Sequence, residues 1–174
     1  MFSDPEKNIE QFGLHDGMAV ADLGAGTGAY TIAAAKKVRG GGRVYAVEVQ
    51  KDFLSTIKEA ASAAGVSNVE FIWGDIERPG KTKIGDGMVD AVIASNVLFQ
   101  VEDKKGFIGE IKRILKSGGK VLVIDWQDSF GGLGPVREHL VHANEARGLF
   151  ENSGFTFAES ISAGEHHWGF VMKK

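Results

Sequence analysis

The stretch Val-Ala-Asp-Leu-Gly-Ala-Gly-Thr-Gly at residues 20–28 decides the fold of this chain. An apolar run that begins at Met18 ends at Leu23, and three alternate glycines follow it. An alanine-rich segment, residues 29–38, follows at once. This order predicts a buried strand, a glycine turn and a helix. Because glycine has no side chain, the backbone N–H groups of the turn and the helix N-terminus can come close to a ligand. The sequence therefore predicts a small-molecule cofactor site at this turn.

The residues around the glycines narrow the choice of cofactor. Gly24, Gly26 and Ala29 satisfy the Gly/Ala form of the dinucleotide fingerprint. Asp22, however, lies two residues before the first glycine, at the mouth of the strand. Its carboxylate would repel a pyrophosphate in the turn by roughly 3 kcal/mol, for a separation of about 5 Å and an effective dielectric constant of about 20. A ligand that carries an ammonium or sulfonium group would be attracted instead.

Residues 22–28 match the pattern acidic-x-Gly-x-Gly-x-Gly at every constrained position, and here the chain resembles the class I S-adenosylmethionine-dependent methyltransferases. The resemblance covers almost the whole chain, from about Glu6 to Lys174. It implies a Rossmann-like α/β fold whose seven-stranded, mostly parallel sheet has the order 3-2-1-4-5-7-6, with helices on both faces and a C-terminal antiparallel hairpin. It also implies S-adenosylmethionine as the cofactor.

Composition limits the remaining possibilities. The 174 residues, 43% hydrophobic and 25% charged, are ordinary for one soluble domain, with a short helical segment at 1–17 and a Rossmann-like core at 18–174. The chain has no cysteine, which excludes disulfides and cysteine metal sites, and we expect no metal. The net charge of −3 and the scattered Lys and Arg residues argue against a nucleic-acid substrate. No apolar segment approaches the ~20 residues that span a bilayer, and the N-terminus is not a signal peptide, so we expect a cytoplasmic location.

Apolar spacing and glycine positions predict strands that alternate with helices. Strands are expected at residues 18–23, 43–49, 69–73, 89–94 and 120–126. Helices are expected at 29–38, 51–64, 104–116 and 136–152, after a short helix that ends near 9–14. A polar loop joins the third and fourth strands, Gly118 and Gly119 close the helix at 104–116, and residues 155–161 and 167–172 form the hairpin. This alternation predicts a parallel sheet that is covered on both faces.

Acidic residues stand at three successive strand ends, where open α/β sheets bind their ligands. Asp22 ends the first strand, and Glu48 ends the second, 24 residues after Gly24, where a carboxylate can accept hydrogen bonds from both ribose hydroxyls. The resemblance places Asp75 against the adenine amino group, with Ile76 on the ring. The alternatives are a solvated carboxylate at Glu48 and a local turn at Asp75.

The fourth strand ends in Ser-Asn-Val-Leu-Phe at residues 95–99. The resemblance places this segment beside the methionine part of the cofactor and the transferred methyl group, with Asn96 as its wall, while Leu98 and Phe99 can equally be core residues. The full set of cofactor-binding residues that we expect is Asp22, Gly24, Ala25, Gly26, Gly28, Glu48, Val49, Gly74, Asp75, Ile76 and Asn96.

Candidate catalytic residues follow the fifth strand. The resemblance implies that this strand end lines the acceptor side, so Asp125 and Trp126 can position a substrate, although Trp126 can equally anchor the next loop. His139 and His142 are three residues apart on an expected helix and would share a face, where one can serve as a base. At the expected hairpin, strand alternation points only one of His166 and His167 inward.

These patterns favour methyl transfer from S-adenosylmethionine to a small-molecule acceptor by in-line displacement. Alignment and exclusion of water suffice for this chemistry, because the sulfonium already activates the methyl group, so no catalytic triad is needed. The run at 123–126 and the Gly-Pro pair at 134–135 resemble the quinone-biosynthesis and arsenite methyltransferase group. Arsenite itself is excluded, because the enzymes that methylate it hold arsenic through cysteine thiolates.

Several alternatives stay open. A nicotinamide-dependent oxidoreductase or a non-catalytic cofactor-binding protein would share the fold, and a protein or lipid could be the acceptor. Only about 17 residues precede the first strand. Residues 1–12 therefore fold over the cofactor, or a second subunit of a homodimer covers it, or the site is open.

Overall fold

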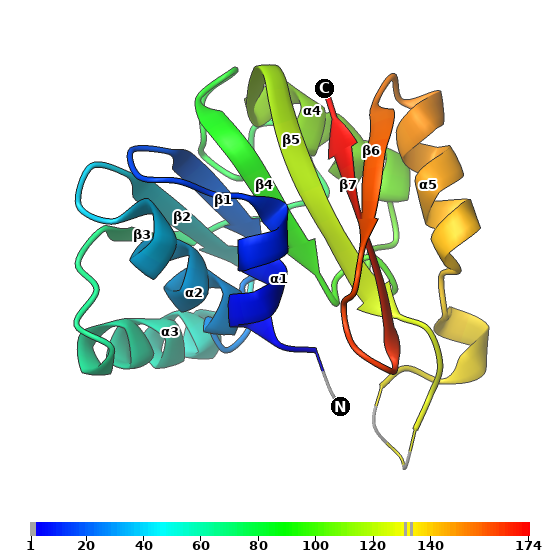
Figure 1. The fold of residues 1–174 in the computed structure, drawn as a ribbon, viewed down its shortest axis with the longest axis horizontal. Coiled ribbons are helices and arrows are strands. Elements are labelled where there is room, and N and C mark those ends of the chain that lie inside the picture. The colour runs from blue at the N-terminus through cyan, green and yellow to red at the C-terminus, as the bar shows by residue number, and fades with distance from the viewer. Residues whose placement is uncertain (1–2, 131, 133) are drawn as a thin grey trace.

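The computed structural model describes residues 3–130, 132 and 134–174, and these form a seven-stranded sheet in the order β3-β2-β1-β4-β5-β7-β6 (Figure 1). The strands are β1 (Ala19–Leu23), β2 (Arg43–Glu48), β3 (Val69–Trp73), β4 (Val89–Ser95), β5 (Leu115–Trp126), β6 (Thr156–Ile161) and β7 (His167–Lys173). The first five are parallel, and β7 pairs antiparallel with both β5 and β6. The predicted strand order and C-terminal hairpin are confirmed.

Helices cover both faces of the sheet, as predicted. They are α1 (Pro5–Phe12), α2 (Ala29–Val38), α3 (Lys51–Ala63), α4 (Lys104–Ile114), the 3-10 helix η1 (Arg137–His139) and α5 (Ala143–Asn152). The apolar sides of α1 and α2 bury Ile9 and Val38 against Val20 of β1, whereas α4 and α5 bury Phe107 and Phe150 on the other face. Figure 1 shows α1 in front of the sheet and α4 behind it. No helix in the described residues is long and apolar enough to cross a membrane, and the cytoplasmic location stays a prediction.

The short helix before β1 has both of its ends set by sequence. The Asp4 side chain caps its N-terminus by accepting a hydrogen bond from the Lys7 backbone N–H, and Pro5 takes the first turn, where no N–H is needed. Gly13 ends the helix in the left-handed conformation, with φ of 69°. The short helix predicted before the first strand is confirmed.

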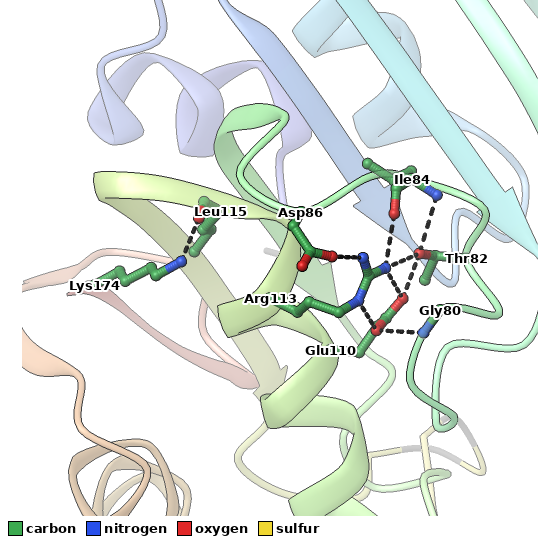
Figure 2. Close-up of polar contacts among 8 residues, drawn as sticks. All are labelled: Gly80, Thr82, Ile84, Asp86, Glu110, Arg113, Leu115 and Lys174. Carbon is green, nitrogen blue, oxygen red and sulfur yellow. Dashed lines mark hydrogen bonds and ion pairs between the residues drawn. The ribbon is translucent and has the colours of Figure 1, made fainter.

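A loop joins β3 to β4 where an α/β fold usually has a helix, and α4 holds this loop in place (Figure 2). The fully buried carboxylate of Glu110 accepts hydrogen bonds from the Gly80 backbone N–H at 2.9 Å and from the Thr82 hydroxyl. Arg113, one turn further along α4, forms an ion pair with Glu110 at 2.7 Å and donates to the Ile84 carbonyl oxygen. The predicted polar loop is therefore a fixed structure.

Two predicted helix boundaries are wrong. The helix expected at 104–116 ends at Ile114, and β5 starts at Leu115 rather than at 120. The glycines at 118 and 119 do not close the helix. They lie in a bulge of β5, because Val89 pairs with Leu115 while Ala91 pairs with Lys120. Gly118 adopts a φ of 74° in this bulge, a conformation that suits glycine.

The helix expected at 136–152 is also wrong, since η1 and α5 are separate. Leu140 and His142 between them have extended backbones, with ψ of 131° and 149°. The indole N–H of Trp168 on β7 donates a 3.0 Å hydrogen bond to the Val141 carbonyl oxygen. This long-range contact fixes the extended link, so His139 and His142 do not share a helix face.

Candidate functional site

A cavity of about 780 Å³ opens at the carboxyl ends of β1 to β4, and its volume is typical of a cofactor pocket. Nine of the eleven expected cofactor-binding residues line it: Asp22, Gly24, Ala25, Gly26, Glu48, Val49, Asp75, Ile76 and Asn96. The sequence did not single out several other lining residues, among them Ser3, Thr27, Tyr30 and Phe53. Phe53 could have been found, because it lies in the first turn of the helix after β2.

The three glycines of the turn have different tasks. All three have positive φ, at 75° for Gly24, 54° for Gly26 and 85° for Gly28. A Cβ on Gly24 would lie 2.8 Å from Val97, and one on Gly28 would lie 2.8 Å from Ile57, whereas one on Gly26 would lie 4.0 Å from the Gly24 carbonyl oxygen. Gly28 precedes α2 and does not line the cavity. A glycine is required at this position because α2 packs closely against α3, not because the residue contacts a ligand.

Asp22 is 2% exposed at the end of β1, where its carboxylate accepts a 2.6 Å hydrogen bond from the Thr31 hydroxyl on α2. Burial is the main reason that the pKa of Asp22 is raised to about 6, and the negative charge of Glu48 adds to the rise. The hydrogen bond from Thr31 opposes it. Thr31 is not among the residues predicted from the sequence, although a hydroxyl residue in the first turn of the helix after the glycines is a recognisable signal.

Glu48 ties the glycine turn to the end of β2. Its Oε2 atom accepts a 3.0 Å hydrogen bond from the Gly26 backbone N–H, and its Oε1 atom accepts from the N–H groups of Val49 and Gln50. The carboxylate is 6% exposed and lines the cavity. These contacts fix its orientation before any ligand binds, and it is not the solvated carboxylate of the alternative interpretation.

Asp75 both forms a turn and lines the cavity. Its Oδ1 atom accepts a 2.9 Å hydrogen bond from the Glu77 backbone N–H, and Arg78 lies 3.5 Å from its other oxygen. The adjacent Gly74 does not line the cavity. It is a glycine because a Cβ there would lie 2.7 Å from the Lys81 carbonyl oxygen, so it serves the packing of the β3–β4 loop.

The end of β4 presents two polar atoms to the cavity wall without partners. The Ser95 hydroxyl and the Asn96 Oδ1 atom are buried and have no hydrogen-bond partner among the described residues. Asn96 also has a φ of 55°, which is uncommon for a residue other than glycine. Buried polar groups are usually paired, so these two atoms are available to a ligand.

The charge of the cavity has one sign. Its acidic lining residues are Asp22, Glu48, Asp75 and Glu77, and the described residues that line it include no Lys, Arg or His. Such a site attracts a cationic ligand and repels a pyrophosphate.

Residues that precede β1 form one wall of this cavity. Ser3 and Pro5 line it. The Ser3 hydroxyl lies 2.8 Å from the Tyr30 hydroxyl, which also accepts a 2.7 Å hydrogen bond from the Asn8 side-chain amide. The sequence left open whether the N-terminal segment folds over the cofactor. The described part of this segment lies beside the cavity, and residues 1–2 fall outside the described residues.

The three expected catalytic residues do not come together. Asp125 is 1% exposed and does not line the cavity, and its carboxylate accepts hydrogen bonds from the backbone N–H groups of Phe99 and Trp126. Its burial raises its pKa to about 6. His139 and His142 are exposed and lie on separate elements. Asp125 thus connects the turn after β4 to β5.

Aromatic side chains at the end of β5 and at the start of β7 have different roles. The Trp126 ring packs against Gly134, where a Cβ would lie 2.8 Å from it, so Trp126 anchors the following loop. His167 is 5% exposed, whereas the His166 ring is paired with Asp128 at 2.8 Å. Only one of the two hairpin histidines points inward, as strand alternation predicts.

Comparison with known proteins identifies the family. A family model described as "Methyltransferase domain" matches residues 14–156. The chain belongs to this family. An arsenite methyltransferase of Halobacterium salinarum is 31% identical over 109 residues, which cover 63% of this chain and 27% of that protein. The ubiquinone/menaquinone biosynthesis C-methyltransferase UbiE of Enterobacter sp. is 30% identical over 139 residues, which cover 79% of this chain and 52% of UbiE. The chain thus spans about half or less of the length of these relatives.

A solved structure supports the same assignment over the whole fold. The crystal structure of a SAM-dependent methyltransferase from Aquifex aeolicus superposes with a TM-score of 0.89 at 27% identity, covering 99% of this chain and 90% of that one. The family and the S-adenosylmethionine cofactor predicted from the sequence agree with these relatives. Neither comparison supports the nicotinamide-dependent alternative.

Proposed function

We propose that this chain transfers a methyl group from S-adenosylmethionine to a small-molecule acceptor. The observation that carries this proposal is the cavity itself: four carboxylic acids, no basic lining residue among those described, and two unpaired polar atoms at the end of β4. A sulfonium cofactor with an α-ammonium group suits this charge, whereas a dinucleotide does not. The names of the arsenite and quinone-biosynthesis relatives support a small acceptor.

Each strand end would hold one part of the cofactor. The carboxylate of Asp22 would attract the ammonium group, and Glu48, already oriented by three backbone N–H groups, would accept hydrogen bonds from the ribose hydroxyls. Asp75 would accept from the adenine amino group while Ile76 packs on the ring. Asn96 and Ser95 would pair with the methionine part through their orphaned oxygen atoms.

The protein's contribution to the reaction is alignment and exclusion of water. When bound, the cofactor supplies an electrophilic methyl group. The wall of residues 3–5 and the turn after β4 would restrict its position so that the acceptor attacks opposite the sulfur atom. Proximity of this kind lowers a barrier by up to roughly 7–11 kcal/mol in favourable cases.

Calorimetric titration tests the proposal. We expect S-adenosylmethionine and S-adenosylhomocysteine to bind with micromolar affinity, NADH not to bind, and Asp22→Ala to weaken both cofactor forms at least tenfold. The matched control is Glu59→Ala, which removes an exposed carboxylate from α3 and should leave the affinities unchanged. Binding of NADH in place of S-adenosylmethionine would overturn the proposal.

A further inference from the structure

His167 is a buried side chain without a hydrogen-bond partner among the described residues. It opens β7, is 5% exposed, and pairs in the sheet register with Trp126, whose ring centre lies 4.3 Å from its own. Within residues 3–130, 132 and 134–174, neither of its ring nitrogens has a hydrogen-bond partner. Buried polar groups are usually paired, so these two nitrogens are available to a ligand.

The sheet register places His167 at the same edge of the sheet as the cofactor cavity, although His167 does not line that cavity. Ser95 pairs with Ile124, which pairs with Gly169, so β7 lies two strands away from the cavity wall on β4, about 10 Å at ordinary strand spacing. His167 stands two residues before Gly169 on this antiparallel strand, about 7 Å beyond the level of Ser95. Alternation of side chains puts Ser95 and His167 on the same face as the buried Ile93 and Val171.

The electrostatic surroundings keep His167 neutral. Burial lowers the pKa of its imidazole, the neighbouring charge of His166 lowers it further, and Asp128 on the loop after β5 opposes both. A neutral imidazole near pH 7 has a free lone pair that can accept a proton. The Trp126 ring, which is partly exposed, lies beside the imidazole.

We propose that His167 is the catalytic base for an acceptor hydroxyl, an inference that rests on the proposed methyl transfer. The oxygen of the acceptor attacks the methyl carbon, the C–S bond breaks, and its electron pair neutralises the sulfonium to give S-adenosylhomocysteine. The hydroxyl proton passes to a ring nitrogen of His167, and the imidazolium later releases it to water. The other candidates do not offer this: the Asp125 carboxylate is occupied by two backbone N–H groups, and His139 and His142 are exposed.

Histidine NMR tests acceptor contact without requiring turnover. The protein is labelled at histidine Cε1, His167 is assigned with His167→Gln, and catechol is titrated into the S-adenosylhomocysteine complex. We expect a saturable shift of the His167 signal, and at least tenfold weaker catechol binding in His167→Gln. The matched control is His166→Gln, which should bind catechol as the unchanged protein does. A His167 signal that does not respond to catechol overturns the inference.

Methyl transfer separates a catalytic role from a structural one. With labelled S-adenosylmethionine, transfer to catechol should rise with pH through the pKa that NMR reports for His167, and His167→Gln should lower kcat at least 100-fold. Transfer to benzenethiol, which ionises without a base, should change less than threefold. Equal losses for both acceptors, or none for catechol, overturn the inference. Failure of S-adenosylhomocysteine to bind the unchanged protein would instead refute the proposed function.

Discussion

The Thr31 hydroxyl donates a 2.6 Å hydrogen bond to the carboxylate of Asp22, and this pair joins the first turn of α2 to the end of β1 inside the cavity wall. Asp22 is nearly inaccessible to water, and burial raises its pKa to about 6. A cationic ligand near this carboxylate favours its ionised form. Cofactor binding and the protonation of Asp22 are therefore linked.

The first prediction is that S-adenosylmethionine binds more weakly in acid. Asp22 is ionised above pH 6 and protonated below it, so the affinity should be constant above about pH 7 and should fall by up to about tenfold per pH unit below pH 6. Calorimetry between pH 5 and pH 8 measures this dependence. Asp22→Asn should bind weakly and without the inflection. Asp125→Asn, which removes a carboxyl of similar pKa outside the cavity, should keep it.

The second prediction concerns Thr31 itself. The hydrogen bond from its hydroxyl lowers the pKa of Asp22, so Thr31→Val should raise that pKa above 6 and move the inflection in cofactor affinity to higher pH. It should also lower the free energy of unfolding by about 1–3 kcal/mol, because a buried acceptor loses its donor. Thr31→Ser keeps the hydroxyl and should behave as the unchanged protein. An inflection that stays in place in Thr31→Val would show that the hydroxyl does not tune Asp22.

Much of the cavity lining could be predicted from the sequence because its residues lie at the ends of strands. Parallel strands share one edge for their carboxyl ends, so chain order alone brought Asp22, Glu48 and Asp75 to one cavity. Gly28 and Gly74 do not line the cavity, and the sequence could not separate them from the others because close packing and ligand contact both demand glycine. Only the structure shows Ile57 against the first and the Lys81 carbonyl oxygen against the second.

The acceptor side was predicted less well because long-range contacts decide it. Periodicity suggested one helix at 136–152, but the contact from Trp168 to Val141 spans 27 residues and holds the link extended. Likewise, the carboxylate of Asp125 is at the expected strand end, yet the Phe99 N–H, 26 residues away in the chain, occupies it. No local pattern contains these partners.

The third prediction uses the buried carboxyl of Asp125. The pKa of Asp125 in the folded state is about 6, above the ordinary value of 3.8, so the folded state binds more protons than the unfolded state between pH 4 and pH 6. The stability that this group contributes below pH 4 is therefore lost as the pH rises through 6. The free energy of unfolding of the unchanged protein, relative to Asp125→Asn, should therefore fall by about 2 kcal/mol between pH 4 and pH 7. Urea titrations of both proteins at each pH measure it. A constant difference would contradict the raised pKa.

The fourth prediction concerns the ion pair that holds the β3–β4 loop (Figure 2). Burial alone would raise the pKa of Glu110, but hydrogen bonds from Arg113 and Thr82 outweigh it and lower the pKa. Arg113→Met leaves this carboxylate buried without its cation and should cost about 3–5 kcal/mol of unfolding free energy. It should also weaken S-adenosylmethionine binding, because the cavity residue Asp75 lies in the first part of this loop.

A matched pair on α5 controls for the loss of an arginine in a helix. Arg147 and Glu151 form an exposed ion pair at 2.8 Å, and Arg147→Met should cost less than about 1 kcal/mol. Chemical denaturation of both variants measures the contrast. Equal costs would mean that burial of Glu110 does not determine the strength of the pair.

The fifth prediction tests the N-terminal wall of the cavity. Tyr30→Phe keeps the ring in place but removes the hydroxyl that contacts Ser3 and Asn8, so the segment before α1 loses its attachment to α2 and keeps only the 2.9 Å hydrogen bond from the Asn8 amide to the Ser3 hydroxyl. We expect S-adenosylhomocysteine to dissociate three- to tenfold faster, as measured by stopped-flow fluorescence, while the fold stays intact by circular dichroism. Deletion of residues 1–4, which removes Ser3 itself, should have the same effect, and combining it with Tyr30→Phe should add little. An unchanged dissociation rate in both variants would show that this wall does not retain the cofactor.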